Sequence, residues 1–255
     1  MKTLILIAMS LLAPVALSQG ALPADASPAV IVDWAAARAG GDAWLHARSN
    51  RMEGWAELCR GGLASRCVRA DRYVMYRVYP RELEQAHAGT GKFRLDAMRE
   101  GRVIFQSSFD GERSYNQDGP MPEDRAADSE ASAFGYSAIR FATQPGFGLE
   151  RLTDDTVDGH PCYMIRVTDP SGSSTLFGID RESAYLRLAA WDTPRGWHER
   201  IYSDFYWVAD PGFLQPGRVR FYYDGARSVD VHWTSASINE QIADEVFVLG
   251  PKAGQ

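Results

Sequence analysis

The chain has 255 residues, of which 45% are hydrophobic and 24% are charged, and its formal net charge is −6. This composition is ordinary for a globular protein of one domain or of a closely packed pair of domains. The excess of acidic residues gives the protein no electrostatic attraction to phosphate backbones, so we expect no nucleic-acid partner.

Residues 1–18 have the three parts of a secretory signal peptide. Lys2 supplies a positive charge, Leu4 to Leu17 form an apolar segment, and Ala16-Leu17-Ser18 is a small-x-small cleavage site. The apolar segment is short for a membrane-spanning helix. We therefore predict cleavage after Ser18, secretion through the inner membrane, and a periplasmic location.

Residues 19–29 are rich in Pro and Ala and are predicted to form a flexible leader, and 30–250 are predicted to form a single domain. Apolar residues at helical spacing predict one helix over 30–39 and a second over 133–143. The stretch 117–132 before the second helix is polar, acidic and contains Pro, so it is predicted to be a mobile loop.

Most of the remaining sequence alternates apolar and polar residues with a period of two, which predicts antiparallel strands. The predicted turns between these strands contain Gly after an acidic residue or after Pro. They are Glu100-Gly101, Asp110-Gly111, Asp158-Gly159, Pro170-Ser171-Gly172, Pro194-Arg195-Gly196 and Asp224-Gly225.

The clearest of these hairpins surrounds the turn that begins at Asp224. A two-residue turn there would scatter the apolar residues over both faces of the strands. A three-residue loop instead pairs Phe221 with Val229. It also pairs Val219 with Val231, and one face of the hairpin stays apolar. We therefore predict the register of the three-residue loop.

Three cysteines in an exported chain predict one disulfide and one spare thiol. Cys59 and Cys67 flank Gly61-Gly62, a turn that would set them opposite each other on adjacent strands. Cys162 would then be a small buried hydrophobic residue. Three free thiols are the alternative. A metal site is not expected, because the cysteine pair has no pair of histidines nearby.

The sequence contains no recognisable catalytic motif. The five histidines form neither HExxH nor HxH, and GxSxG, a Walker loop and GxGxxG do not occur. The acidic pair Asp154-Asp155 lies in polar loop sequence, where solvated charge is the simpler interpretation. We therefore expect a protein that is not an enzyme and that uses no cofactor.

Both ends of the chain resemble the LolA/LolB-like periplasmic carrier family. In the C-terminal region a strand precedes Pro216, two long strands follow it, and the chain closes with Asn239, Ile242 and Phe247. In the N-terminal region a helix, a Gly-Gly pair and a Trp-Leu pair are followed by a strand that contains Gly54. The two matches are independent of each other.

The middle of the chain extends this resemblance over most of residues 30–248. An Asp-Gly turn with an aromatic residue after it, and a Gly and a Tyr before a strand that ends Ile-Asp, occur at Asp110, Gly111, Tyr115, Gly159, Tyr163, Ile179 and Asp180. The resemblance implies a mainly β (α+β) fold. A curved antiparallel sheet would form an incomplete barrel, and the short helices would pack in its open side.

The resemblance also implies a function in outer-membrane lipoprotein sorting or lipid transport, through binding of lipid or of lipoprotein acyl chains without catalysis. Burial of such chains is worth about 0.8 kcal/mol per methylene. A packed core is the alternative role for the apolar residues involved. The predicted cavity residues are Phe105, Ile139, Phe141, Ile165, Phe177, Leu188, Phe205, Phe221, Val231 and Trp233.

Two features leave room for other functions on the same fold. The carriers need an Arg in the sheet that holds the lid closed, and Arg77, Arg94 and Arg166 are equal candidates. The acidic stretch 117–132 has no counterpart that the family leads us to expect. The first alternative is an envelope-stress sensor or interaction module that binds an envelope membrane protein. The second is an enzyme that acts on lipid or glycan.

Overall fold

The computed structural model describes residues 22–59, 66–80 and 91–250. The predicted signal peptide and the predicted turn at Gly61-Gly62 lie outside the described residues. The described part of the predicted leader is hydrogen-bonded to the sheet. Tyr163 donates a hydrogen bond to the carbonyl of Leu22 at 3.0 Å, and Arg151 donates to the carbonyl of Ala24 at 2.9 Å.

The described residues form short helices and many strands. The α-helices are α1 (Pro28–Ala39), α2 (Asp42–Leu45) and α3 (Glu123–Phe134), and the 3-10 helices are η3 (Gly135–Arg140) and η4 (Asp244–Phe247). The strands are β1 (Ser49–Cys59), β2 (Cys67–Val78), β3 (Lys92–Arg99), β4 (Arg102–Phe109), β5 (Ser114–Asn116), β6 (Gly119–Pro120), β7 (Gly148–Arg151), β8 (Asp155–Val157), β9 (His160–Thr168), β10 (Ser174–Asp180), β11 (Leu186–Thr193), β12 (Gly196–Ser203), β13 (Tyr206–Val208), β14 (Phe213–Gln215), β15 (Arg218–Tyr223) and β16 (Ala226–Ile238).

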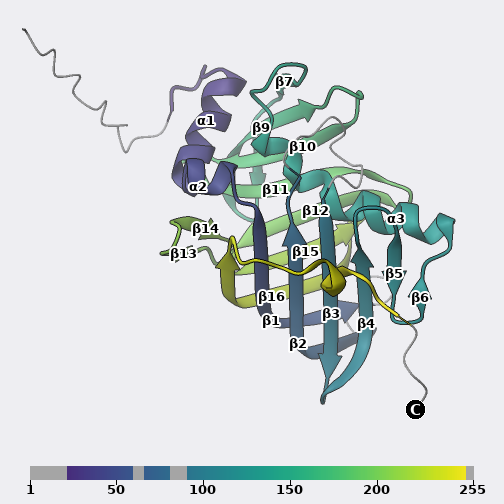
Figure 1. Ribbon diagram of the computed structural model, residues 1–255. Coiled ribbons are helices and arrows are strands. Elements are labelled where there is room, and N and C mark those ends of the chain that lie inside the picture. The colour runs from purple at the N-terminus through teal and green to yellow at the C-terminus, as the bar shows by residue number, and fades with distance from the viewer. Residues whose placement is uncertain (1–21, 60–65, 81–90, 251–255) are drawn as a thin grey trace, which may run out of the picture.

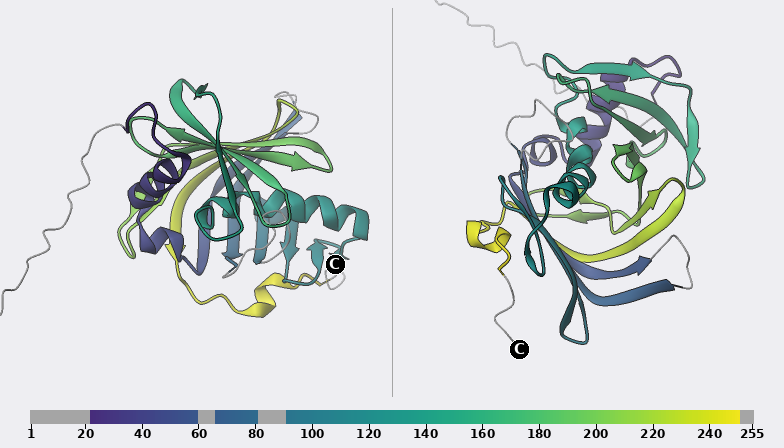
Figure 2. Two further views of the ribbon diagram at one scale, coloured as in Figure 1. Left: turned by 90° about the horizontal axis from the view of Figure 1, so that it is seen from above. Right: turned by 90° about the vertical axis from the view of Figure 1, so that its right-hand side faces the viewer.

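One antiparallel sheet of 14 strands contains almost all of these elements, in the order β6-β5-β4-β3-β2-β1-β16-β15-β12-β11-β10-β9-β7, with β8 also paired to β9. The strands β13 and β14 form a separate pair. The sheet curves strongly and stays open, with α1, α3 and η3 on its concave side (Figures 1 and 2). The predicted fold class, an incomplete antiparallel barrel with short helices in its open side, is confirmed.

Three of the predicted acidic-Gly turns join neighbouring strands in the same way. In the turn between β3 and β4, Glu100 has φ of 52° and Gly101 has φ of 75°. Asp158-Gly159 and Asp224-Gly225 also have positive φ at both positions. Two-residue turns of this type match the right-handed twist of the strands they connect. An acidic residue followed by Gly at these positions therefore sets the pairing of the strands on either side.

The register predicted for the last hairpin is confirmed, although its turn is shorter than predicted. Phe221 pairs with Val229, and Val219 pairs with Val231. Tyr223 pairs with Ala226, so the turn has two residues and not three. An irregularity after Phe221 restores the register that keeps the apolar residues on one face.

The predicted disulfide between Cys59 and Cys67 is present. The two residues are directly paired on β1 and β2, with a Cα–Cα distance of 3.9 Å. Cys162 is a free and fully buried cysteine, as expected. The disulfide therefore joins the ends of two neighbouring strands at one edge of the molecule.

The helices near residue 130 differ from the prediction. The predicted mobile loop 117–132 contains most of α3, and the helix predicted over 133–143 is the 3-10 helix η3. Glu123 and Asp124 lie in the first turn of α3, where negative charge interacts favourably with the helix dipole. These acidic residues help to start a helix, although their composition is that of a surface loop.

Candidate functional site: a cavity between α3 and the sheet

The concave side of the sheet holds two cavities of very different size among the described residues. The larger has a volume of about 920 Å³ and lies between α3 and strands β1 to β5, β12, β15 and β16; we call it the α3 cavity. The smaller, of about 20 Å³, lies beneath α1, α2 and η3. Only the first is in the size range of small-molecule and cofactor sites.

Apolar side chains from neighbouring strands form the floor of the α3 cavity. Met75 of β2 pairs with Leu95 of β3, and both line the cavity. At its mouth lie Val68, Ile104 and Phe105, which are 38%, 39% and 42% exposed. Exposed hydrophobic side chains that gather at a cavity mouth are typical of a binding site.

Helix α3 covers this cavity without filling it. None of the described side chains of α3 is fully buried, and they are mostly acidic residues, Ser and Ala. Hydrogen bonds attach the helix to the sheet at its C-terminal half. On one side Ser129 bonds to Ser107 of β4 at 2.9 Å, and on the other Trp191 of β11 donates to the carbonyl of Ala131 at 2.8 Å. The helix thus bridges the cavity from one wall to the other.

Arg200 of β12 makes a further contact with α3, because its guanidinium donates to the carbonyl of Ser132. The histidine beside it fixes its position. His198 is fully buried, its Nδ1 lies 3.1 Å from the carbonyl of Tyr222, and its Nε2 accepts from Arg200 Nε at 3.1 Å. This pattern requires the neutral imidazole that carries its proton on Nδ1. Burial and the charge of Arg200 agree with it, since they lower the pKa of His198 to about 3.

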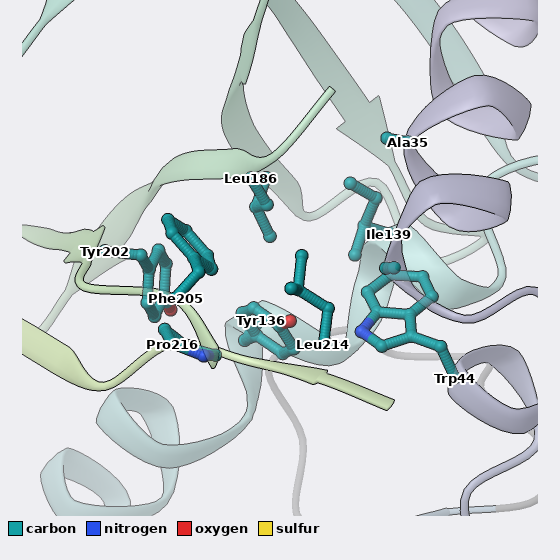
Figure 3. Close-up of a pocket in the computed structure, with 10 residues that line it drawn as sticks. Ala35, Trp44, Tyr136, Ile139, Leu186, Tyr202, Phe205, Leu214 and Pro216 are labelled. Carbon is teal, nitrogen blue, oxygen red and sulfur yellow. The ribbon is translucent and has the colours of Figure 1, made fainter. Parts of the chain in front are cut away.

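The smaller cavity lies in that part of the concave side where side chains fill almost all of the space. Figure 3 shows the side chains of Trp44, Ile139 and Leu214 converging there from α2, η3 and β14. A space of about 20 Å³ accommodates roughly one water molecule. At this end Tyr136 of η3 is enclosed, and burial raises the pKa of its hydroxyl to about 12.

The structure divides the ten predicted cavity residues between these places. Phe105 and Phe221 line the α3 cavity, and Ile139 and Phe205 line the smaller one. Neither lining includes the other six. Five of them belong to the buried core of the concave face: Phe141, Ile165, Phe177, Val231 and Trp233.

Leu188 lies on the opposite face of the sheet from these residues. It packs with Cys162 and Met164, whereas Leu186, two positions earlier, packs in the concave core. The pairing of β10 with β11 is irregular here. Gly178 of β10 pairs with Leu188, whereas the next residue, Ile179, pairs with Leu186. One extra residue reverses the alternation of faces. The expectation that Leu188 shares the concave face is therefore corrected.

The three predicted lid arginines also lie in different places. Arg94 pairs with Asp96 at 2.9 Å and donates to the carbonyl of Val246 near the C-terminus. Arg166 is exposed and pairs with Glu150 at 2.6 Å. Of the three, only Arg77 lines the α3 cavity. Arg200, which bonds directly to α3, was not predicted from the sequence.

A metal cluster and a membrane-spanning helix are both absent from the described residues. They contain no group of three or more His, Cys, Asp and Glu side chains arranged to hold a metal ion. No helix in the described ranges has the length and hydropathy needed to cross a membrane.

Comparison with known proteins finds similar structures and no similar sequences. No family model matches the sequence, and no curated protein matches it. A DUF1329 family protein from Desulfovibrio piger is 12% identical, with a TM-score of 0.50 over 87% of this chain and 98% of that one. A LolA superfamily protein from Nitrosomonas europaea is 10% identical, with a TM-score of 0.49 over 88% of this chain and 98% of the other.

A third similar structure is a domain described as a putative outer membrane lipoprotein-sorting protein, from Vibrio parahaemolyticus. It is 11% identical, with a TM-score of 0.47 over 86% of this chain and 94% of that domain. At such identities a structural match concerns the fold alone. The match to the Desulfovibrio protein and the open, helix-lined sheet show the half-barrel fold that the sequence predicted.

Proposed function

We propose that the protein binds lipid, or the acyl chains of a lipoprotein, in the α3 cavity and carries or presents them in the bacterial periplasm without catalysing a reaction. The observation that carries this proposal is a cavity of about 920 Å³ with apolar side chains on its floor, beneath a helix whose described side chains are not fully buried and are mostly acidic residues, Ser and Ala. The similarity in fold to lipoprotein-sorting proteins agrees with it.

The energetics of the cavity favour an elongated apolar ligand. The side chains of Tyr73, Met75 and Leu95 line the cavity from β2 and β3. Each methylene that enters such a site gains about 0.8 kcal/mol, so a chain of ten buried methylenes gains roughly 8 kcal/mol before the costs of binding. No specific polar contact is required for this gain, which suits transfer of related ligands.

The direct test is to identify the ligand that is purified together with the protein. Mass spectrometry of a hydrophobic extract of the purified protein is expected to reveal lipid or acylated peptide in a defined ratio to protein. A stable protein partner with no bound lipid would favour the interaction-module alternative. Turnover of a lipid or glycan that a single polar substitution abolishes would favour the enzyme.

Substitutions test the position of the site. Phe221→Glu places a charge on the cavity wall, and we expect it to abolish binding of a fluorescent acyl-chain probe while the protein stays folded. Trp207→Glu is the matched control, because Trp207 is 54% exposed and lies outside the cavity. Probe binding that survives Phe221→Glu unchanged would contradict this placement of the site.

The proposed location has its own measurement. If the protein is exported to the periplasm, its intact mass there should correspond to a chain that begins at Gln19. Retention of residues 1–18 in periplasmic material would contradict the proposed cleavage.

A further inference from the structure

The charge on the wall of the α3 cavity is opposite to that of the protein as a whole. The net charge of the chain is −6. The cavity lining contains four arginines, Arg77, Arg125, Arg195 and Arg200, against two acidic residues, Asp124 and Asp128. An interior that is positive in an acidic protein creates a local potential that attracts anions.

Two of these arginines lie on the strands that form the interior wall. Arg77 is only 6% exposed, and it shares a face of β2 with Tyr73 and Met75 of the apolar floor. Arg200 enters from β12, on the far side of the cavity, where His198 fixes it. Their positive charges therefore face the same space from two different parts of the sheet.

A second buried arginine lies near Arg77. Arg140 of η3 is 7% exposed, and its three guanidinium nitrogens have no hydrogen-bond partner among the described residues. Its guanidinium carbon lies 4.0 Å from the ring centroid of Tyr79, and that of Arg77 lies 6.0 Å from the same centroid. The guanidinium carbons of Arg77 and Arg140 are therefore at most 10 Å apart, which is the sum of their distances to that shared centroid.

Buried positive charges so close together repel each other and lose hydration. Burial, with the charges of Arg200 and Arg140 nearby, lowers the pKa of Arg77 to about 10. A buried charge is costly unless a counter-charge and hydrogen bonds compensate for it. For Arg140, aromatic rings supply part of this compensation. Its guanidinium lies over the ring of Tyr79, and its guanidinium carbon is 5.1 Å from the ring centroid of Trp44.

We propose that the ligand of the α3 cavity is an anionic amphiphile, whose carboxylate or phosphate head group binds between Arg77 and Arg200 and whose acyl chain lies along Tyr73, Met75 and Leu95 toward the mouth. This inference rests on the proposed function and specifies the chemical class of its ligand. Arg140 adds positive potential from behind the head group. Guanidinium groups are well suited to carboxylate and phosphate, which they bind by paired hydrogen bonds.

The dimensions of β2 agree with this orientation of the ligand. Arg77 lies near one end of the strand, and Val68 at the mouth lies nine residues away. At about 3.3 Å per residue, Val68 lies roughly 30 Å from Arg77 along the strand. The charged end of the ligand would lie deep in the cavity, and its chain would run out toward the exposed apolar side chains of Val68, Ile104 and Phe105.

A pair of probes that differ only in the head group tests the inference. Pyrenedodecanoic acid and pyrenedodecanol have the same chain and fluorophore, and we expect the unmodified protein to bind the acid at least tenfold more tightly. Arg77→Met and Arg200→Met should each remove most of this preference, which is measured as the ratio of the two affinities within each variant. Arg166→Met is the control, because it removes one exposed positive charge far from the cavity lining.

The outcomes separate this inference from the proposed function. Binding of both probes with equal affinity would overturn the anionic head group and leave the lipid-binding proposal intact, whereas binding of neither would overturn both. Displacement of the acid by millimolar inorganic phosphate, but not by chloride at equal ionic strength, would identify free phosphate as the anion and overturn the amphiphile. Arg77→Lys, which keeps the charge and loses the planar fork, should retain part of the preference for the acid.

Discussion

The two ends of the concave face are built on one sheet and differ in their packing. The end beneath α1, α2 and η3 is packed solid, and we call it the filled end. The end beneath α3 contains the α3 cavity, and we call it the hollow end. Five of the six residues of η3 are buried, and they include Ile139 and Ala138. None of the described side chains of α3 is buried. Among the described residues, the side chains of η3 pack into the concavity of the sheet, whereas those of α3 leave a cavity beneath them.

This difference separates stability from binding in the same molecule. Apolar contacts at the filled end contribute to the free energy of unfolding, whereas those at the hollow end remain available to a ligand. Because hydrogen bonds attach α3 mainly through residues 129–132, the helix can stay in place without burying apolar surface of its own. The comparison predicts that equal substitutions at the two ends have unequal effects.

The largest expected effect is that of a charge at the filled end. Ile139 is 1% exposed, and Ile139→Glu should lower the free energy of unfolding by more than about 3 kcal/mol, because the carboxylate would be buried without a partner. Phe105→Glu at the hollow end, where Phe105 is 42% exposed, should cost less than about 1 kcal/mol. Chemical denaturation of the two variants checks both values, and similar losses would contradict the division.

Reduction of the disulfide tests how much the cross-link at the hollow end contributes to the free energy of unfolding. Cys59 and Cys67 are separated by eight positions, and closure of so short a loop stabilises the folded state by about 2.5 kcal/mol in the chain-entropy model. Denaturation with and without reductant should show a loss of this order. Cys59→Ser/Cys67→Ser should match the reduced protein and should be insensitive to reductant, and a reductant effect that persisted in this variant would contradict the assignment.

The junction of the two helical segments gives an intermediate effect. A Cβ atom at Gly135 would lie 2.4 Å from a ring carbon of Trp191, and the hydrogen bond from that ring to Ala131 prevents easy movement. Gly135→Ala should therefore cost about 1–3 kcal/mol of stability by overpacking. Gly148→Ala is the matched control, because its nearest neighbour would lie 3.6 Å away. Equal melting temperatures of the two variants would contradict this account.

The smallest effect is a dependence on pH. His198 has a pKa of about 3 in the folded protein, and an unfolded histidine titrates near 6.5. Between these values the unfolded chain binds a proton that the folded chain does not, so the free energy of unfolding falls as the pH is lowered from 6.5. Over the first pH unit this contribution is at most about 1.4 kcal/mol. His198→Gln should show a shallower dependence than the unmodified protein, and equal slopes would argue against a buried neutral histidine.

The sequence was a good guide to the sheet, because strand pairing depends on local signals. Acidic-Gly turns and period-two alternation predicted most hairpins, and the apolar face of the last one predicted the pairing of Phe221 with Val229. Local irregularities were the limit. The bulge that turns Leu188 to the opposite face leaves no clear pattern in the residues around it.

The cavity was predicted less well, because it depends on what lies opposite the sheet. The polar composition of 117–132 indicated a loop, and the helix-starting signals of Glu123 and Asp124 after Pro122 were not recognised. Arg77, Arg140 and Arg200 come from three distant segments, and no spacing in the sequence relates them. Most of the predicted cavity residues were therefore apolar positions of the core.

The position of β16 beside β1 has a consequence for the order in which the protein folds. Arg48 donates to the side chain of Asn239 at 2.7 Å, across 191 positions of the chain. Contacts so distant in sequence form slowly, because a long loop must close before they stabilise anything. In the large sheet of the described residues, the run β1 to β6 and the run from β15 to β7 are each paired internally, and β16 joins the two runs. The α3 cavity takes Leu95 from the first group and Phe221 from the second, so it is among the last features to form as the chain is completed.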